Sequence, residues 1–98
     1  MQMFDHDEEG YREWIKSHPI GFVLVSHNPP SSKYISVHRA DCHTINPAKA
    51  RHKENWTKSY IKLCADVEAE LTQWATSQWG QQVAPLRPCG HCKRAGRV

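Results

Sequence analysis

The residues best suited to chemistry are four cysteines and seven histidines, an unusual number for a chain of 98 residues. Two of the cysteines, Cys89 and Cys92, form a Cys-x-x-Cys pair directly after a proline. Two thiolates at this spacing can bind one metal ion, with backbone N–H groups of the intervening turn pointing at the sulfurs. The pair therefore predicts one half of a tetrahedral Zn²⁺ site.

A second half-site lies earlier in the chain, where His38 and Cys42 stand four positions apart. If a strand ends at His38 and a helical turn begins near Asp41, the imidazole and the thiol converge on one point. We therefore expect one structural Zn²⁺ held by His38, Cys42, Cys89 and Cys92, with Cys64 as the alternative fourth ligand. Such a metal would tie the C-terminal tail to the sheet and add the folding free energy that a small core lacks.

Other uses of the cysteines stay open. A redox dithiol normally sits at the start of a helix in a thioredoxin-like unit, and no helical pattern follows Cys92. Four cysteines also allow three disulfide pairings, and they can simply remain reduced without metal. The first nine residues are acidic and do not resemble a secretory signal, which favours a reducing, cytoplasmic compartment.

The elements that must position these residues follow from periodicity. Tyr11, Trp14, Ile15 and His18 form one helical stripe, which Asp5 or Asp7 can cap and Pro19 ends. Strands are predicted over 20–26, 34–38 and 60–64, the first two as an antiparallel hairpin, with a short helical turn over 40–46. A second helix is predicted over 67–79, with Asp66 as its N-cap and Gly80 at its C-terminal end.

This order of elements predicts a single α+β domain over residues 1–98. We expect a small antiparallel sheet of about three strands, packed on one face by the N- and C-terminal helices and stapled by zinc. The acidic N-terminal helix would occupy 1–19, the core 20–92 and a basic tail 93–98. The length leaves no room for a second core, and no apolar run is long enough to cross a membrane.

Positive charge gathers in the middle of the chain, where seven basic residues between Lys33 and Lys62 face only two acidic ones. Clustered bases with aromatic neighbours are typical of nucleic-acid binding. The candidate contacts are Arg39, Lys49, Arg51, Lys53, Trp56, Lys58 and Lys62. Tyr34, Trp56 or Tyr60 can stack on an exposed base. Trp56 is the first choice, because no helical or strand stripe buries it; the alternative is that it packs back onto the sheet.

No pattern for catalysis is visible. The chain has no zinc-protease, nucleophile-elbow or phosphate-loop motif. The terminal Pro-Cys-x-x-Cys invites comparison with zinc deaminases, but Arg39 and Ala40 follow His38, so the glutamate required two positions after the histidine is missing. The sequence therefore favours a binding module over an enzyme.

Five short motifs together resemble a small bacterial zinc-binding module found in proteins that act on DNA, including defence nucleases. They are the apolar run 21–25, His38-Arg-Ala-Asp-Cys42 with Ile45, Lys62-x-Cys64, Leu71-x-x-Trp74-Ala75, and Pro88-Cys-Gly-His-Cys92. The resemblance covers residues 20–92 and implies a DNA-related binding role.

Two hypotheses of function follow. The first is a zinc-stabilised module that binds nucleic acid, more specifically DNA, as part of a DNA-acting or defence system. The second is a protein-interaction or regulatory module that keeps the structural zinc and uses the same basic segment, with the acidic N-terminal helix, to contact a protein partner. Salt dependence separates them, because phosphate contacts weaken steeply as salt rises and apolar contacts do not.

Overall fold

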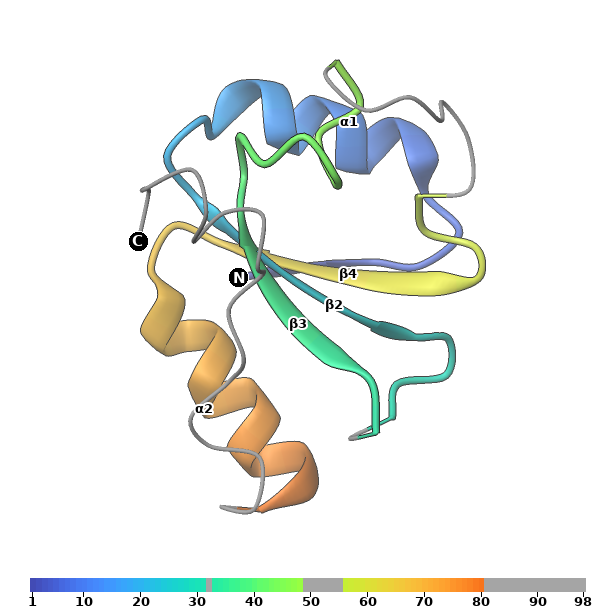
Figure 1. Cartoon of the computed structure of the whole chain (residues 1–98), viewed down its shortest axis with the longest axis vertical. Helices are drawn as coiled ribbons and strands as arrows, with labels where there is room; N and C mark the ends of the chain where they lie inside the picture. The colour runs from blue at the N-terminus through green and yellow to red at the C-terminus, as the bar shows by residue number, and fades with distance from the viewer. Residues whose placement is uncertain (32, 49–55, 81–98) are drawn as a thin grey trace.

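The computed structural model describes residues 1–31, 33–48 and 56–80. In these residues the elements follow the order β1 (Gln2–Phe4), α1 (Glu8–Ser17), β2 (Phe22–His27), β3 (Ile35–Arg39), β4 (Tyr60–Ala65) and α2 (Glu68–Trp79). The strands form one antiparallel sheet in the order β1-β4-β2-β3, with two helices packed on it (Figure 1). The α+β class is confirmed. Strand β1 was not predicted, and it makes the sheet four-stranded.

The two helices cover opposite faces of the sheet (Figure 1). Val23 and Val25 of β2 join the core under α1, whereas Leu24 joins the core under α2. The prediction that both helices lie on one face is therefore wrong. The physical reason lies in β2, whose apolar run is continuous, as in a strand buried on both sides.

Helix α1 forms as its sequence pattern predicts. Tyr11, Trp14 and Ile15 are buried, and the Asp7 side chain caps the helix by accepting a hydrogen bond from the Gly10 N–H at 2.9 Å. The Tyr11 hydroxyl donates to the Ile45 carbonyl at 2.6 Å. This bond fixes the 40–46 turn against the helix.

Helix α2 begins at Glu68, one residue later than the start predicted with Asp66 as N-cap. Its N-cap is Val67, which has extended backbone and no capping side chain, so the prediction of Asp66 as N-cap is wrong. The other end is confirmed, because Gly80 has a φ of 81° and its N–H donates to the Thr76 carbonyl at 2.8 Å. Leu71 and Ala75 are the residues that α2 buries. None of the helices in the described residues has the length and apolar character needed to cross a membrane.

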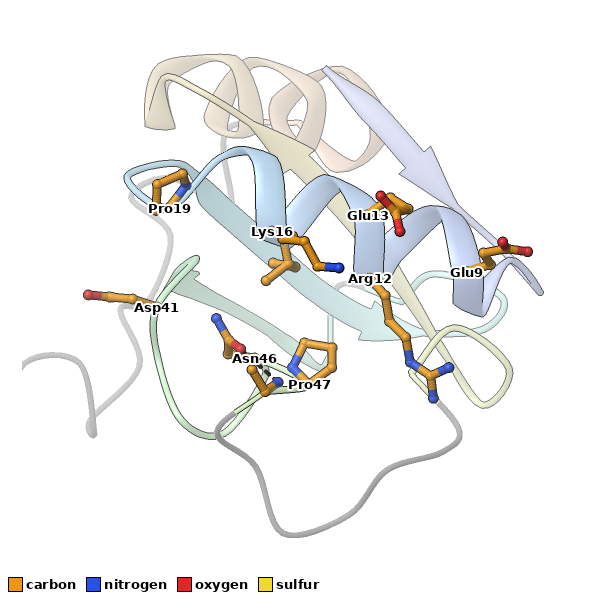
Figure 2. Close-up of a pocket in the computed structure, with 10 residues that line it drawn as sticks. Glu9, Arg12, Glu13, Lys16, Pro19, Asp41, Asn46 and Pro47 are labelled. Atoms are coloured by element: carbon orange, nitrogen blue, oxygen red, sulfur yellow. Dashed lines mark hydrogen bonds between the residues drawn. The ribbon is translucent and has the colours of Figure 1, made fainter.

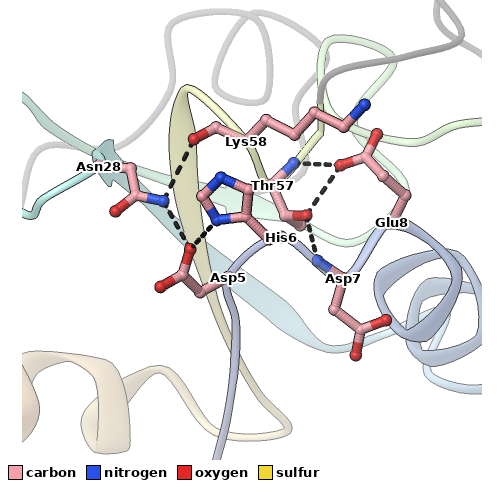
Figure 3. Close-up of polar contacts among 7 residues, drawn as sticks. All are labelled: Asp5, His6, Asp7, Glu8, Asn28, Thr57 and Lys58. Carbon is pink, nitrogen blue, oxygen red and sulfur yellow. Dashed lines mark hydrogen bonds and ion pairs between the residues drawn. The ribbon is translucent and has the colours of Figure 1, made fainter.

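A dense set of hydrogen bonds joins the start of α1 to Thr57, just before β4 (Figure 3). The Glu8 carboxylate accepts from the Thr57 N–H, from the Thr57 hydroxyl at 2.8 Å and from the Trp56 N–H at 2.8 Å. Thr57 in turn accepts from the His6 and Asp7 N–H groups, each at 2.8 Å. The backbone before β4 is therefore held by the turn that precedes α1.

These hydrogen bonds favour the ionised form of the Glu8 carboxyl and so lower its pKa. Burial raises the pKa of its carboxyl, but hydrogen bonds from Trp56 and Thr57 and the nearby Lys58 ammonium outweigh it, so the pKa lies below 4.5. A carboxyl whose pKa is lower in the folded state contributes stability above its unfolded pKa, and that stability is lost as the pH falls through the folded value.

We expect Glu8→Gln to lower the free energy of unfolding at pH 7 by about 1–2 kcal/mol, less than a fully buried charged hydrogen bond contributes, because Glu8 is partly exposed. The matched control is Glu9→Gln, which removes the same charge from the same first turn at an exposed position. Urea denaturation measures both. The difference between the two variants should shrink as the pH falls through the lowered pKa of Glu8, because the protonated carboxyl no longer accepts these hydrogen bonds as an anion. Equal stability of the two variants at pH 7 would contradict this role of Glu8.

Candidate functional site

The structure brings His38 and Cys42 together as the sequence predicts. His38 lies in β3, Cys42 lies in the following turn, and both side chains are buried. The Thr44 hydroxyl lies between them, 3.3 Å from His38 Nδ1 and 3.0 Å from Cys42 Sγ. The second ring nitrogen, Nε2, contacts the Ser36 hydroxyl at 3.0 Å. Both ring nitrogens of His38 therefore contact hydroxyl groups, and one of these hydroxyls also contacts the Cys42 thiol.

The alternative ligand, Cys64, lies on the same face of the sheet but across a strand from His38. Val23 of β2 pairs with His38 on one side and with Cys64 on the other. Two strand spacings separate His38 from Cys64, roughly 10 Å between their backbones. Cys64 is fully buried, and this burial raises the pKa of its thiol well above the ordinary range. The sheet register thus separates Cys64 from His38, whereas His38 and Cys42 share the Thr44 hydroxyl.

The described residues contain two of the predicted zinc ligands. No group of three or more His, Cys, Asp or Glu side chains in residues 1–31, 33–48 and 56–80 is placed to hold a metal ion. Cys89 and Cys92 lie outside the described residues. The half-site formed by His38 and Cys42 is thus the part of the predicted zinc site that the structure describes.

Two of the predicted nucleic-acid contacts lie in the core instead. Trp56 is 1% exposed and packs against Tyr11, with ring centroids 6.1 Å apart. Lys62 is 4% exposed, and its ammonium donates to the Trp56 carbonyl and lies 5.5 Å from the centre of the Tyr11 ring. Burial lowers the pKa of Lys62 to about 8. The expectation that Trp56 stacks on a base and that Lys62 contacts a phosphate is corrected, because neither side chain reaches solvent.

The remaining predicted contacts have different surroundings. Lys58 is exposed, directly after Thr57. Arg39 is half-buried, 3.9 Å from the Asp41 carboxylate and 5.8 Å from the Phe22 ring centre, which belongs to the core under α2. Lys49, Arg51 and Lys53 lie outside the described residues.

Three aromatic side chains gather at the end of the sheet where β2 ends and β4 begins. His27 and Tyr60 are paired across β2 and β4, and their ring centroids lie 5.8 Å apart. Tyr34, just before β3, lies 4.6 Å from His27 and 5.8 Å from Tyr60. We call His27, Tyr34 and Tyr60 the aromatic patch. Both tyrosines are predicted stacking candidates from the sequence, whereas His27 is not, because only the strand register brings it next to Tyr60.

One exposed lysine, Lys33, directly precedes Tyr34 of the aromatic patch. Lys58 lies two residues before Tyr60, but its side chain extends toward Glu8, and its ammonium helps to lower the pKa of that carboxyl (Figure 3). Asn28, next to His27, donates through Nδ2 to the Lys58 carbonyl at 3.2 Å and to the Asp5 carboxylate at 2.6 Å (Figure 3). Hydrogen bonds from Asn28 and His6 lower the pKa of Asp5. The Asp5 carboxylate is therefore already engaged by hydrogen-bond partners.

A separate cleft of about 540 Å³ lies between α1 and the 41–48 segment (Figure 2). Its walls include Ile15, Pro19 and Pro47, and both signs of charge line it. Arg12 and Lys16 carry the positive charges, and Glu9, Glu13 and Asp41 carry the negative ones. The mixture of charges defines no class of ligand, and the cleft shares no residue with the aromatic patch.

Comparison with known proteins found no match: the chain matches no family model, no curated protein and no solved structure. The half-site and the aromatic patch are therefore the features from which a function can be inferred.

We expect Trp56→Ala to lower the free energy of unfolding by about 3–5 kcal/mol, the usual cost of truncating a buried tryptophan. Trp79→Ala is the matched control, because Trp79 is only partly buried at the end of α2, and it should cost clearly less. Urea denaturation of the two variants makes the comparison. A Trp56→Ala protein as stable as the wild type would show that this ring is not part of the core.

Proposed function

We propose that this protein is a zinc-stabilised module that binds nucleic acid. The observation that carries the proposal is the aromatic patch, with the exposed Lys33 directly before Tyr34. Aromatic rings that stack on bases, next to lysines that contact phosphates, are the combination by which proteins hold nucleic acid strands. The patch offers both within one short stretch of surface, contributed by the ends of β2 and β4 and the segment before β3.

The two kinds of side chain have different tasks. The Lys33 and Lys58 ammonium groups contact phosphate oxygens, which provides affinity and orientation without reading sequence. Tyr34 and His27 provide ring surface for a base, worth about 1–3 kcal/mol per stacked base. The antiparallel pairing of β2 with β4 holds His27 and Tyr60 in register, so the patch is built on strands rather than on a free loop.

The proposed zinc site has a structural task. His38 and Cys42 would supply two ligands, and Cys89 and Cys92 would supply the other two. The support in the described residues is the shared Thr44 hydroxyl between His38 and Cys42, together with the Ser36 hydroxyl on the opposite ring nitrogen. When bound, Zn²⁺ would supply folding free energy and link the C-terminal segment to the turn after β3.

We expect one Zn²⁺ per chain and a fold that depends on it. Cys89→Ser and Cys42→Ser should each lower the melting temperature and the zinc content, because the binding free energy of a structural metal is folding free energy. Elemental analysis of the purified protein and thermal denaturation with and without EDTA measure both. A metal-free protein whose melting temperature is unaffected by EDTA would contradict the zinc proposal.

The identity of the fourth ligand has its own test. His38→Ala should weaken zinc binding by at least about tenfold more than Cys64→Ala, since even a residue that only orients a ligand changes metal affinity about 10- to 100-fold. Competition with a chromogenic chelator measures the two affinities. The spectrum of the cobalt-substituted protein provides the second readout: three thiolates and one imidazole are expected, and four thiolates would place Cys64 in the site instead.

We expect nucleic-acid binding to weaken steeply as salt rises. Lys33→Glu combined with Lys58→Glu should reduce affinity to a similar degree for different base sequences. The slope of log K against log salt should flatten by about 1.4–1.8, since each of the two lost phosphate contacts removes about 0.7–0.9. Lys16→Glu is the control, an exposed lysine on α1 that lines the separate cleft. Anisotropy titrations with labelled oligonucleotides give the slopes.

Two results would overturn the proposed function. The first is no binding to any oligonucleotide at tens of micromolar protein, a range in which non-specific binders register. The second is an equal effect of the Lys16 variant and the Lys33/Lys58 variant, which would mean that overall charge rather than the patch attracts the ligand. Either result favours the protein-interaction hypothesis.

A further inference from the structure

We infer that the aromatic patch binds an unpaired base, so that the ligand is single-stranded nucleic acid rather than a duplex. This inference rests on the proposed function and adds the class of nucleic acid to it. It depends on how the three rings lie relative to one another, on what supports them from inside, and on where Lys33 stands.

The rings of the aromatic patch differ from the other aromatic pairs of the described residues in their exposure. Within the patch the ring planes are inclined by 22–47° to one another. The pairs Tyr11–Trp56 and Trp14–His18 also lie at small angles, 35° and 9°, but each contains at least one buried ring. Tyr34 and His27 are both exposed, so their rings are accessible to a further flat group.

The exposure of the patch is graded from the core outward. Tyr60 is partly buried and packs against the core under α1, and the buried Lys62 ammonium lies 5.6 Å from its ring centre. Tyr34 is 40% exposed, and His27 is exposed as well. Tyr60 thus supports the patch from inside, and Tyr34 and His27 offer their rings to solvent. A ring held from behind loses little conformational entropy when a base stacks on it.

A base can use such a surface only if it is unpaired. In a duplex both faces of each base are covered by neighbouring base pairs, so stacking on a protein ring requires that the base leaves the helix, at a cost of a few kcal/mol. A single strand presents its bases without that cost. Lys33 directly precedes Tyr34 and is exposed, so it can contact a phosphate next to the stacked base.

The test uses the full-length, zinc-loaded protein with a labelled 12-nucleotide oligo(dT) strand and a 12-base-pair duplex at the same salt concentration. We expect the single strand to bind at least about tenfold more tightly than the duplex, the equivalent of about 1.4 kcal/mol. Tyr34→Ala should weaken single-strand binding about 5- to 150-fold, which corresponds to the loss of one stacked base. Tyr34→Phe is the matched control and should bind as the wild type does, because it keeps the ring.

A second measurement avoids any change to the protein. Oligo(dT) in which every base is replaced by an abasic site keeps its phosphates and should bind the wild type at least as weakly as the complete strand binds the Tyr34→Ala variant. The salt slope should be unchanged in both cases, because no phosphate contact is lost.

The possible outcomes distinguish a failure of the single-strand inference from a failure of the proposed function. Equal affinity for strand and duplex, or for complete and abasic strands, overturns the single-strand inference and leaves the proposed function standing through its lysine contacts. Binding to neither ligand overturns the proposed function. Preference for the single strand with loss in Tyr34→Ala and rescue in Tyr34→Phe supports both.

Discussion

The carboxylate of Glu8 is the contact that holds the start of β4, and with it the Tyr60 side of the aromatic patch. It accepts hydrogen bonds from the Trp56 N–H and from both the N–H and the hydroxyl of Thr57, and so fixes the backbone that enters β4. With that backbone fixed, Trp56 enters the core beside Tyr11, and Lys58 remains on the surface. Loss of the Glu8 hydrogen bonds would therefore affect the positions of both Trp56 in the core and Lys58 on the surface.

The half-site and the aromatic patch lie on the same face of the sheet, near opposite ends of strand β2. Near its start, Val23 lies between His38 of the half-site and Cys64. At its end, His27 pairs with Tyr60 in the aromatic patch. Four residues along a strand span about 13 Å, so the two sites are distinct. Zinc at the half-site would therefore influence ligand binding through the stability of the sheet rather than through contact with the ligand.

The parts of the fold that the sequence predicted are those governed by local pattern. The Tyr11–Trp14–Ile15 stripe, the Asp7 cap and the cores of three strands follow from spacing and residue type alone. The convergence of His38 and Cys42 also follows, because both lie around one turn. Features that depend on contacts between distant segments were not predictable in this way. Strand β1 has only three residues, too few for an alternating pattern, and forms by pairing with β4.

The burial of Trp56 also depends on contacts between distant segments and was not predictable from local pattern. Nothing in its neighbouring residues indicates burial, since its partners Glu8 and Tyr11 come from the other end of the chain. His27 was missed in the aromatic patch for the same reason, because its neighbour Tyr60 is set by the β2–β4 register.

Native mass spectrometry of the metal-replete protein, with and without a short single-stranded oligonucleotide, measures zinc and nucleic-acid binding together. We expect a protein peak that carries one zinc ion per chain, and a second peak in which the same zinc-loaded protein has gained the mass of the oligonucleotide. A folded, metal-free protein that gains no oligonucleotide would contradict this expectation.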